Sequence, residues 1–369
     1  MNITYVYYTD HNQRSAHNNQ IIHTCNALDH AGHTVTVVTS GGLQQYANKH
    51  GLAVSFEIYK MYPTGLHPLA SQILYYLGAL RVAYSSDILF TRDISFLKLL
   101  KLIPESLTPP IIFEAHKCYS VVDDMDRTEE QWRLKRADGI ITISDGIRSD
   151  IEALNITVDA VVRDAANTEY VPATTRQELR TKLNIDQDTI VFIYAGSLNP
   201  DKYDLRGIIK AFQSLESRDA VRLYILGGTP SNINQLKQYT SSVGIEDTVQ
   251  FIGHVPQKLV FQYLTAADIG IVAQQPTDVR ASKYTSPLKL FEYLVCGLGV
   301  IATNVSSIRE VADDEPRILT YDPDGHKDLI TTLKTVTDEY TSLQSDKRST
   351  QYSYQYRAEQ LLSVLNKYN

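Results

Sequence analysis

The chain has 369 residues, of which 43% are apolar and 21% charged, so it can bury the cores of more than one globular domain. A net charge of −7 disfavours nucleic-acid binding, which usually needs a basic surface stripe. The three cysteines are odd in number and far apart, which argues against disulfides and zinc and fits a reducing compartment. No signal peptide precedes the first apolar segment and no apolar run is long enough to span a bilayer, so we expect a cytoplasmic protein.

The first half of the chain opens with a strand–helix–strand pattern. Its predicted elements, in chain order, are a strand at 3–8, a polar loop at 9–19, a helix at 20–30, and strands at 34–39, 87–90, 111–114 and 139–144. Apolar strands that alternate with helices indicate a parallel sheet covered on both faces. We therefore predict a Rossmann-like first domain.

The second half repeats this pattern after residues 157–188, which are poor in apolar periodicity and read as a linker. Its predicted elements are strands at 190–194, 221–226, 249–252 and 269–272, and helices at 205–215, 233–243 and 256–266. The fold class expected is α/β, with two Rossmann-like, doubly wound parallel-sheet domains that face each other across a cleft. The expected domains are residues 1–165, residues 166–350, and a C-terminal helix at 351–369 that packs back on the first domain.

Residues 281–303 are the most informative segment. Pro287 suits the first turn of a helix, where its missing N–H costs nothing, and the free amides of that turn form an anion site at the positive end of the helix dipole. Glu292 lies six residues after Ser286 on the same predicted helix, with Lys289 between them. Amides for phosphates and a carboxylate for vicinal hydroxyls are what a nucleoside diphosphate requires. A core helix with an ordinary N-terminus is the alternative interpretation.

Ligands of such sheets bind at the carboxyl ends of the strands. The loops that follow strands of the second half should therefore converge on one edge, and they span residues 195–203, 227–232, 253–256 and 274–286. First-half loops 9–19 and 114–119 would face them across the cleft. Neither half carries Gly-x-Gly-x-x-Gly after its first strand, and no Gly-x-x-x-x-Gly-Lys-Ser/Thr loop is present, which disfavours a dinucleotide dehydrogenase and an ATPase.

Short motifs in the expected order make the chain resemble the retaining, nucleotide-sugar-dependent glycosyltransferases of family 4, which have the GT-B fold. The strongest is Ser286-Pro287-Leu288-Lys289-Leu290-Phe291-Glu292-Tyr293, followed by Cys296-Gly297. The others are Tyr194-Ala195-Gly196-Ser197 with Lys202, Leu226-Gly227-Gly228, Phe251-Ile252-Gly253-His254-Val255-Pro256, Ala266-Ala267-Asp268-Ile269, Ala31-Gly32-His33, Glu114-Ala115-His116, and the run from Ala137 to Ser144. The resemblance covers nearly the whole chain.

The resemblance implies roles for three residues as the catalytic set. Glu292 matches the second glutamate of the family's Glu-x7-Glu motif, which holds the donor ribose. Lys202 matches the lysine that neutralises the leaving phosphates, and His116 matches the first-domain histidine that touches the transferred sugar and its phosphate. The other donor-binding residues implied are Gly196, Ser197, Gly228, Gly253, His254, Val255, Tyr284, Ser286, Pro287, Leu288 and Lys289.

The chain departs from the family pattern at two donor positions. Tyr284 stands where the family often has its first glutamate, and Ser197 stands where it often has an arginine next to the glycine. Lys289, Arg280 or Arg206 are the candidates to replace the missing phosphate charge. The family's glycine-rich first loop is also absent; His17 and Asn19, which stand there, either meet the acceptor or belong to a solvated loop.

No metal is expected in catalysis. Asp124-Met125-Asp126 imitates the Asp-x-Asp of metal-dependent transferases, but it lies among polar helix-forming residues and not after an apolar strand, which indicates a solvated face.

Membrane contact is a separate question. The apolar segments 69–82 and 96–103 either pack against the first sheet or make peripheral contact with a membrane.

The function predicted on the resemblance is a retaining hexosyltransferase-type enzyme. It would move a sugar from a UDP- or GDP-linked donor to a hydroxyl of a glycan or lipid-linked glycan, without cofactor, metal or nucleic acid. Two alternatives stay open: a nucleotide-sugar 2-epimerase of the same architecture, and an inactive nucleotide-sugar- or glycan-binding protein.

Overall fold

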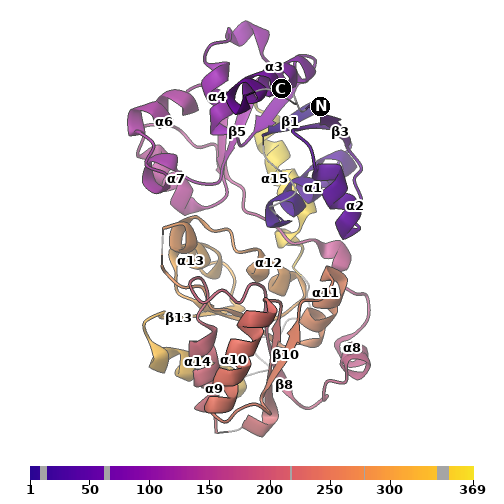
Figure 1. Cartoon of the computed structure of the whole chain (residues 1–369), viewed down its shortest axis with the longest axis vertical. Helices are drawn as coiled ribbons and strands as arrows, with labels where there is room; N and C mark the ends of the chain where they lie inside the picture. The colour runs from indigo at the N-terminus through magenta and orange to yellow at the C-terminus, as the bar shows by residue number, and fades with distance from the viewer. Residues whose placement is uncertain (9–14, 62–66, 217, 278, 339–348) are drawn as a thin grey trace. The chain divides into compact units, whose positions relative to one another are not determined.

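The computed structural model describes residues 1–8, 15–61, 67–216, 218–277, 279–338 and 349–369. The chain forms two compact units (Figure 1). Unit 1 comprises Met1–Asp164 and Tyr354–Asn369, and unit 2 comprises Ala165–Ser353. Each unit contains one sheet in which all strand pairs are parallel. The prediction of two parallel-sheet α/β domains is thereby confirmed.

Unit 1 has a seven-stranded sheet of order β3-β2-β1-β4-β5-β6-β7. Its strands are β1 (Asn2–Tyr7), β2 (Thr34–Thr39), β3 (Glu57–Lys60), β4 (Ile88–Thr91), β5 (Ile111–Ala115), β6 (Gly139–Thr142) and β7 (Ala160–Val161). Its α-helices are α1 (Ser15–His30), α2 (Leu43–His50), α3 (Pro68–Ala83), α4 (Ile94–Leu100), α5 (Tyr119–Val122), α6 (Arg127–Leu134), α7 (Asp145–Glu152) and α15 (Tyr354–Leu365). The strand order reverses between β1 and β4, which makes the carboxyl ends of these strands the expected ligand edge.

The prediction of a loop at 9–19 is wrong at its C-terminal end. Residues 9–14 lie outside the described residues, but Ser15–Asn19 form the first turn of α1, so His17 and Asn19 are helical. The polar composition of this turn concealed it, because Asn18 and Gln20 are buried although they are not apolar. Burial of a side-chain amide costs free energy unless the amide finds hydrogen-bond partners, and the local sequence does not show which residues these partners are.

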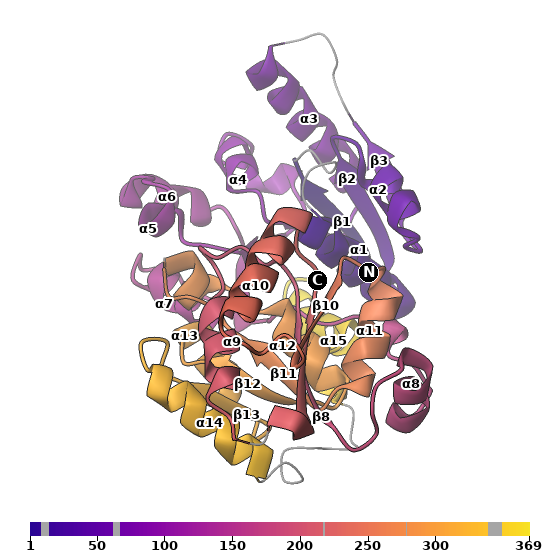
Figure 2. The same ribbon diagram turned by 60° about the horizontal axis from the view of Figure 1, so that its bottom comes forward.

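Unit 2 has a six-stranded sheet of order β10-β9-β8-β11-β12-β13, of which β8, β10, β11, β12 and β13 are labelled in Figure 2. Its strands are β8 (Ile190–Ala195), β9 (Val221–Leu226), β10 (Val249–Gly253), β11 (Ile269–Val272), β12 (Gly299–Thr303) and β13 (Ile318–Tyr321). Its α-helices are α8 (Arg176–Leu183), α9 (Leu205–Gln213), α10 (Pro230–Ser242), α11 (Gln257–Ala266), α12 (Leu288–Val295), α13 (Ser306–Ala312) and α14 (His326–Asp338). The order reverses between β8 and β11.

Two separate hydrophobic cores cover the faces of this sheet. Val191 and Ile193 of β8 pack with α8, α11, α12 and α13, whereas Phe192 and Tyr194 pack with α9, α10 and α14. This alternation follows from the two-residue period of a strand and explains the continuous apolar run of β8.

The Ala-Ala-Asp-Ile motif has a structural role. The Asp268 carboxylate is fully buried and accepts hydrogen bonds from the Val191 amide at 2.7 Å, from Arg176 at 3.1 Å and from Arg180. These bonds join the start of β8 to the start of β11 and to α8. Helix α8 itself lies inside the predicted linker 157–188, so that prediction is wrong over residues 176–183.

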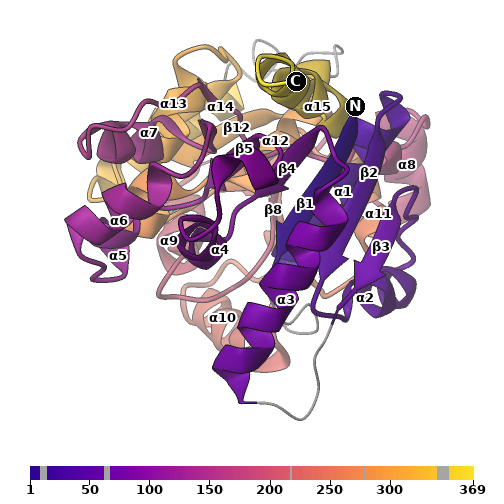
Figure 3. The ribbon, with the colours of Figure 1, turned by 90° about the horizontal axis from the view of Figure 1, so that it is seen from above.

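The C-terminal helix α15 belongs to unit 1 and packs against α1 (Figure 1). The chain leaves unit 1 after Asp164 and returns after Ser353. Helix α3 packs on β1 and α4 (Figure 3). Among the described residues, no helix combines the length and the apolar character needed to cross a membrane.

Candidate functional site

Helix α12 carries the predicted donor motif at the carboxyl edge of the second sheet. Leu290, Phe291 and Leu294 form its buried face, whereas Lys289 and Glu292 are three residues apart and only partly buried on the same side. Pro287 occupies the N-cap position without a side-chain cap, and the Leu290 and Phe291 amides donate to Pro287 O at 2.9 and 3.4 Å. The helix ends at Val295, and Gly297, two residues later, has a positive φ of 85° and donates its amide hydrogen bond to Leu294 O.

Glycine turns follow the first three strands of unit 2 and contact one another. Gly196 N donates to Leu226 O at 3.0 Å, and Gly227 N donates to Gly253 O at 2.7 Å. Gly227 has a φ of +98°, and a Cβ there would lie 2.2 Å from Gly196 O. Gly228 has a φ of +82°, and a Cβ there would meet the Leu198 side chain at 2.4 Å. Only glycine permits these turns to lie so close together.

The ammonium group of Lys289 lies in an aromatic setting beside Gly196. Its Nζ is 3.7 Å from the centroid of the Tyr203 ring and 4.4 Å from that of Tyr194, and it donates a hydrogen bond to Tyr194 Oη at 3.0 Å. A Cβ on Gly196 would lie 3.1 Å from the same Nζ. Lys289 therefore places its ammonium group beside the turn that contains Gly196 and Ser197.

The other two candidates for that charge differ in placement. The Arg206 guanidinium packs over the Tyr239 ring at 5.3 Å, on α9 and α10. Arg280 lies in a π-helical turn, Arg280–Tyr284, and its carbonyl accepts a hydrogen bond from Thr285 Oγ1 at 2.7 Å. Of the three, Lys289 is the one that the structure brings to Gly196.

Lys289 and Glu292 influence each other's ionisation. Burial lowers the pKa of Lys289 to about 7, and the Glu292 carboxylate opposes that change. Burial raises the pKa of Glu292 to about 7, against the Lys289 charge and a hydrogen bond from Gln257 Nε2 at 3.4 Å. Burial thus favours the neutral form of both groups, whereas a diphosphate would favour the charged ammonium and a diol the ionised carboxylate.

Lys202 is exposed on a loop that is fixed at several points to the loop after β11. Gln275 N donates to Lys202 O at 2.9 Å, Gln275 Nε2 donates to Pro200 O at 2.8 Å, and Asp204 N donates to Ala273 O at 3.0 Å. This places Lys202 after β8, at the same end of the sheet as Gly196. Its backbone is ordered by these bonds while its side chain keeps the reach of a surface lysine.

The remaining predicted donor residues fall into two groups. Ser197 and His254 are exposed, and Gly253, Val255 and Leu288 are partly exposed at this edge. Ser286 and Pro287 are buried at the start of α12, and Tyr284 is only 2% exposed. Tyr284 therefore offers a ligand almost no side-chain surface, and the structure gives it a packing position where the family often has a glutamate.

His116 lies in unit 1, directly after β5, within a cluster of charged and polar side chains. Its Nε2 is 3.0 Å from Glu114 Oε2, and 25% of its side chain is exposed. The Arg92 guanidinium lies 3.5 Å from the same Nε2, donates to Gln20 Oε1 at 3.0 Å and contacts His17 Nε2. The loop after His116 is held by Glu130, which accepts from the Tyr119 and Ser120 amides at 2.7 and 2.6 Å.

The side chains of His17 and Asn19, both at the start of α1, contact different neighbours. His17 joins the His116 cluster through Arg92, and its ring lies 4.6 Å from that of Tyr7. The Asn19 side chain instead accepts a hydrogen bond from Tyr46 Oη at 2.9 Å, which ties α1 to α2. Of the two predicted acceptor residues, the structure therefore brings only His17 to His116.

Sequence reasoning missed several members of these clusters. Arg92 directly follows β4, at the carboxyl end of an apolar strand, where ligands of parallel sheets bind. That position alone could have identified Arg92 as a candidate site residue. Tyr194 stood in a quoted motif and Tyr203 at the end of the predicted loop 195–203, both without an assigned role. Arg357, which binds Glu114, lies 243 positions along the chain from its partner, and nothing in its local sequence marks it.

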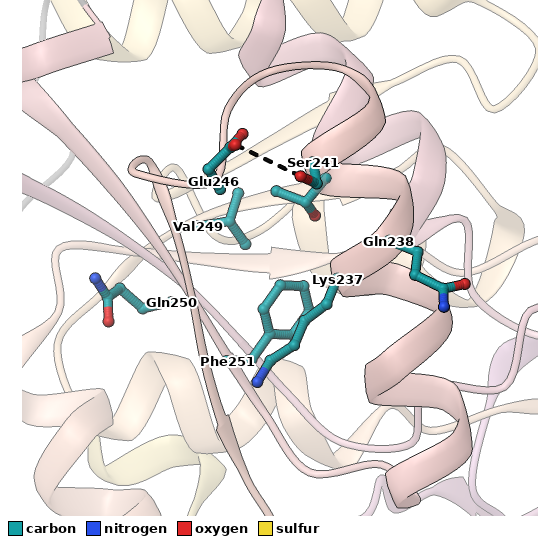
Figure 4. Close-up of a pocket in the computed structure, with 8 residues that line it drawn as sticks. Lys237, Gln238, Ser241, Glu246, Val249, Gln250 and Phe251 are labelled. Carbon is teal, nitrogen blue, oxygen red and sulfur yellow. Dashed lines mark hydrogen bonds between the residues drawn. The ribbon is translucent and has the colours of Figure 1, made fainter.

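A metal centre and a surface groove are two further kinds of candidate site. Within the described ranges, no group of three or more His, Cys, Asp or Glu side chains could hold a metal ion. Asp126, of the Asp-x-Asp imitation, caps α6 by accepting from the Thr128 and Glu129 amides. A groove of about 590 Å³ lies between α10 and β10, lined by Lys237, Glu246 and Phe251 among others, and none of the predicted donor residues borders it (Figure 4).

Two family models match the chain. One, described as "Glycosyl transferases group 1", matches residues 175–356, and the other, described as "Glycosyltransferase Family 4", matches residues 17–163. Together they cover most of both units.

Curated relatives and solved structures agree with these matches. The chain is 29% identical to the O-antigen chain mannosyltransferase B of Escherichia coli over 184 residues, which are 47% of this chain and 45% of that protein. It is 27% identical to the alpha-monoglucosyldiacylglycerol synthase of Streptococcus pneumoniae over 140 residues, which are 38% of this chain and 30% of that protein. The chain thus matches less than half the length of each curated relative. The crystal structure of Anabaena Alr3699/HepE in complex with UDP superimposes with a TM-score of 0.73 at 14% identity, over 100% of both chains, which shows a shared fold.

Proposed function

Because this chain belongs to the glycosyltransferases of group 1 and family 4, we propose that it transfers a sugar from a nucleoside-diphosphate sugar to a hydroxyl of a glycan or lipid-linked glycan. The observation that carries the proposal is the placement of Lys289 and Glu292 on one side of α12, with the Lys289 ammonium beside Gly196. A cation at the N-terminus of a helix and a carboxylate within one helical turn are complementary to a diphosphate joined to a ribose.

In this proposal, unit 2 binds the donor. The first-turn amides of α12 and the ammonium groups of Lys289 and Lys202 hold the diphosphate. The Glu292 carboxylate accepts hydrogen bonds from the ribose hydroxyls, and Gly253 to Val255 border the base through their backbone. The diphosphate is also the leaving group, so cations that bind it stabilise the charge that develops in the transition state.

The transfer is proposed to retain the configuration of the sugar. The bond between the anomeric carbon and the phosphate oxygen breaks, and the acceptor oxygen forms its new bond on the same face of the sugar. The acceptor proton passes to the leaving phosphate oxygen, so no side chain has to remove it. His116 then positions the transferred sugar and need not act as a general base.

The nucleotide is proposed to be UDP or GDP. The Anabaena HepE structure was solved with UDP, which makes UDP-sugars the first donors to test. The names of the two curated relatives, a mannosyltransferase and a glucosyldiacylglycerol synthase, support a hexose and an acceptor that is a glycan or a glycolipid.

Peripheral membrane contact through α3 is part of this proposal, with a cytoplasmic location. Leu69, Ile73, Leu74 and Leu77 are 42–61% exposed and recur along one side of α3. Such a stripe suits insertion into the interface of a membrane that carries a lipid-linked acceptor. Sedimentation with anionic vesicles should fall for Leu77→Glu and not for Val279→Glu, a control at an exposed apolar residue of unit 2. Equal sedimentation of both variants would contradict the contact.

The proposal is tested by incubating the chain with UDP- and GDP-sugars and following the reaction by NMR. Transfer gives free nucleoside diphosphate and a new glycosidic signal with the anomeric configuration of the donor, only when an acceptor is present, and slow donor hydrolysis releases first the anomer of that configuration. EDTA should leave the rate unchanged, as expected for a metal-independent enzyme. An acceptor-independent change of the intact nucleotide sugar would instead indicate the 2-epimerase, and binding without any turnover would indicate the inactive binding protein.

A further inference from the structure

Behind His116, the C-terminal helix places a buried arginine whose hydrogen bonds use all three guanidinium nitrogens. Arg357 is 2% exposed. Its Nε donates to Thr24 Oγ1 at 3.3 Å, and one terminal nitrogen donates to Val162 O at 2.7 Å and to Arg163 O at 2.6 Å. The other terminal nitrogen pairs with the Glu114 carboxylate. A guanidinium held at so many points has one geometry, so its partner is held as well.

Glu114 connects this arginine to the histidine. One carboxylate oxygen, Oε1, bonds to Arg357, and the other, Oε2, lies 3.0 Å from His116 Nε2. Burial alone would raise the pKa of Glu114, but the Arg357 charge, and after it His116, hold that pKa well below its usual range. The carboxylate is therefore ionised at neutral pH, and an ionised carboxylate can only accept hydrogen bonds.

The ionised carboxylate decides which nitrogen of the neutral imidazole carries the proton. Because Glu114 Oε2 has no proton to give, the 3.0 Å contact requires a proton on Nε2, which leaves the lone pair on Nδ1. The Arg92 nitrogen at 3.5 Å cannot donate to an Nε2 that is already protonated, so it does not compete in this tautomer. The histidine is 25% exposed, whereas Glu114 and Arg357 are 3% and 2% exposed, so only the imidazole of the three presents surface to a ligand.

We propose that Arg357 is a positioning residue, which holds Glu114 so that His116 is kept as the Nε2–H tautomer with Nδ1 as a hydrogen-bond acceptor. This inference rests on the proposed function, in which His116 contacts the transferred sugar, and it narrows that role. An acceptor nitrogen recognises a sugar hydroxyl, which can donate, and not a fully ionised phosphate oxygen, which cannot. His116 thus reads a hydroxyl of the sugar.

The other charged groups near His116 do not set the tautomer of its imidazole. Arg92 and His17 contact each other on the side of α1 and β4, and the Gln20 side chain joins Arg92 to the Asp164 carboxylate. Asp164 lies next to the Arg163 carbonyl that Arg357 binds, and burial raises the pKa of Asp164. Glu114 is the carboxylate in hydrogen-bond contact with the imidazole among the described residues.

The test is long-range ¹H–¹⁵N NMR of histidine-labelled protein above the pH of imidazole titration, with His116→Gln to assign the signal. The wild type should show a protonated Nε2 and an unprotonated Nδ1. Arg357→Met and Glu114→Gln should give a mixture of tautomers, because a glutamine amide can accept or donate, and Arg357→Lys should restore the single tautomer. Arg136→Met is the matched control, since Arg136 is also buried in unit 1 but bonds to Leu100 O and Thr108. An unchanged His116 signal in Arg357→Met would overturn the proposal.

Two further measurements separate failure of this inference from other failures. If Arg357→Met does not fold, the double variant Glu114→Gln/Arg357→Met removes both buried charges, and a preserved Nε2–H tautomer in it would equally overturn the proposal. In turnover, Arg357→Met should lower kcat by about 100-fold with little change in donor KM, since a misplaced positioning group costs rate more than binding. A tautomer that depends on Arg357 together with full activity of His116→Gln would refute the catalytic role of His116 and leave the positioning intact.

Discussion

Proton exchange on donor binding is a direct consequence of the pair on α12. Burial lowers the pKa of Lys289 and raises that of Glu292, each to about 7, so both groups can change protonation near neutral pH. A bound diphosphate favours the protonated ammonium of Lys289, and ribose hydroxyls that donate to Glu292 favour its ionised carboxylate.

The two effects have opposite signs. Binding should therefore take up protons at Lys289 and release protons at Glu292, so in the wild type the two exchanges partly cancel. Lys289→Met should therefore show net proton release on binding, because only Glu292 then exchanges protons and loss of the lysine charge raises its pKa further. Glu292→Gln should show net uptake, because loss of the carboxylate lowers the pKa of Lys289 further.

The same signs predict the pH dependence of affinity. Wild-type affinity for a nucleoside diphosphate should fall above about pH 7, where Lys289 loses its proton, and below about pH 7, where Glu292 gains one. Lys289→Met should keep only the acid limb, and Glu292→Gln only the alkaline limb. Loss of a hydrogen bond to a charged group costs about 1.5–3 kcal/mol, which corresponds to about 10- to 150-fold in Kd for Lys289→Met.

Isothermal titration in two buffers of different ionisation enthalpy measures both the affinity and the protons exchanged. Lys258→Met, at an exposed lysine of α11, is the control for loss of one positive charge and should behave as the wild type. The reasoning fails if Lys289→Met binds the diphosphate with wild-type affinity and wild-type proton exchange.

Three stability predictions follow from contacts in unit 2, each measured by denaturant unfolding. Gly227→Ala should lower the free energy of unfolding by about 1–3 kcal/mol or more, because its Cβ would meet a backbone oxygen at 2.2 Å. Gly244→Ala is the control, because Gly244 has a φ of +68° and nothing within 4 Å of its Cβ position, and it should lower the free energy of unfolding less. Equal losses in the two variants would contradict the clash. Tyr293→Phe should cost about 1–3 kcal/mol, because the Ala195 amide loses its acceptor at 3.0 Å; an unchanged midpoint would show that water replaces it. Asp268→Asn should cost about 3–5 kcal/mol by leaving buried arginine charge uncompensated, and a loss below about 1 kcal/mol would refute the importance of that ion pair.

The parts of the fold that follow from local pattern could be predicted. Strand β8 is buried on both faces, so its continuous apolar run identified it, and the glycines after β8, β9 and β10 marked the tight turns at the ligand edge. Helix α12 was recognisable because its apolar residues recur at helical spacing after Pro287 and before Gly297.

The errors have physical causes. Helix α1 begins at Ser15 in a polar stretch that apolar periodicity cannot detect. Helix α8 was placed in the linker although Thr175 and Glu178 form a capping box, a local signal that outweighs weak periodicity.

The long-range contacts of the candidate site could not be predicted from local sequence. The contact of Lys289 with Tyr194 and Tyr203 depends on how α12 packs against β8 and its following loop. The bond between Arg357 and Glu114 joins residues 243 positions apart, and an arginine in a helix ordinarily lies in solvent. Tyr284 was expected to line the donor site, and its burial became visible only in the packed structure.

The most direct test of donor binding at α12 is calorimetric titration of the wild type and Glu292→Gln with UDP, GDP, ADP and NAD, and with the sugar-linked forms of any diphosphate that binds. We expect one nucleoside diphosphate to bind selectively, more tightly with one sugar attached, and about 5- to 150-fold more weakly to Glu292→Gln, as the loss of about 1–3 kcal/mol of hydrogen bonding to ribose requires. Absence of binding by every diphosphate, or equal binding by the wild type and Glu292→Gln, would contradict it.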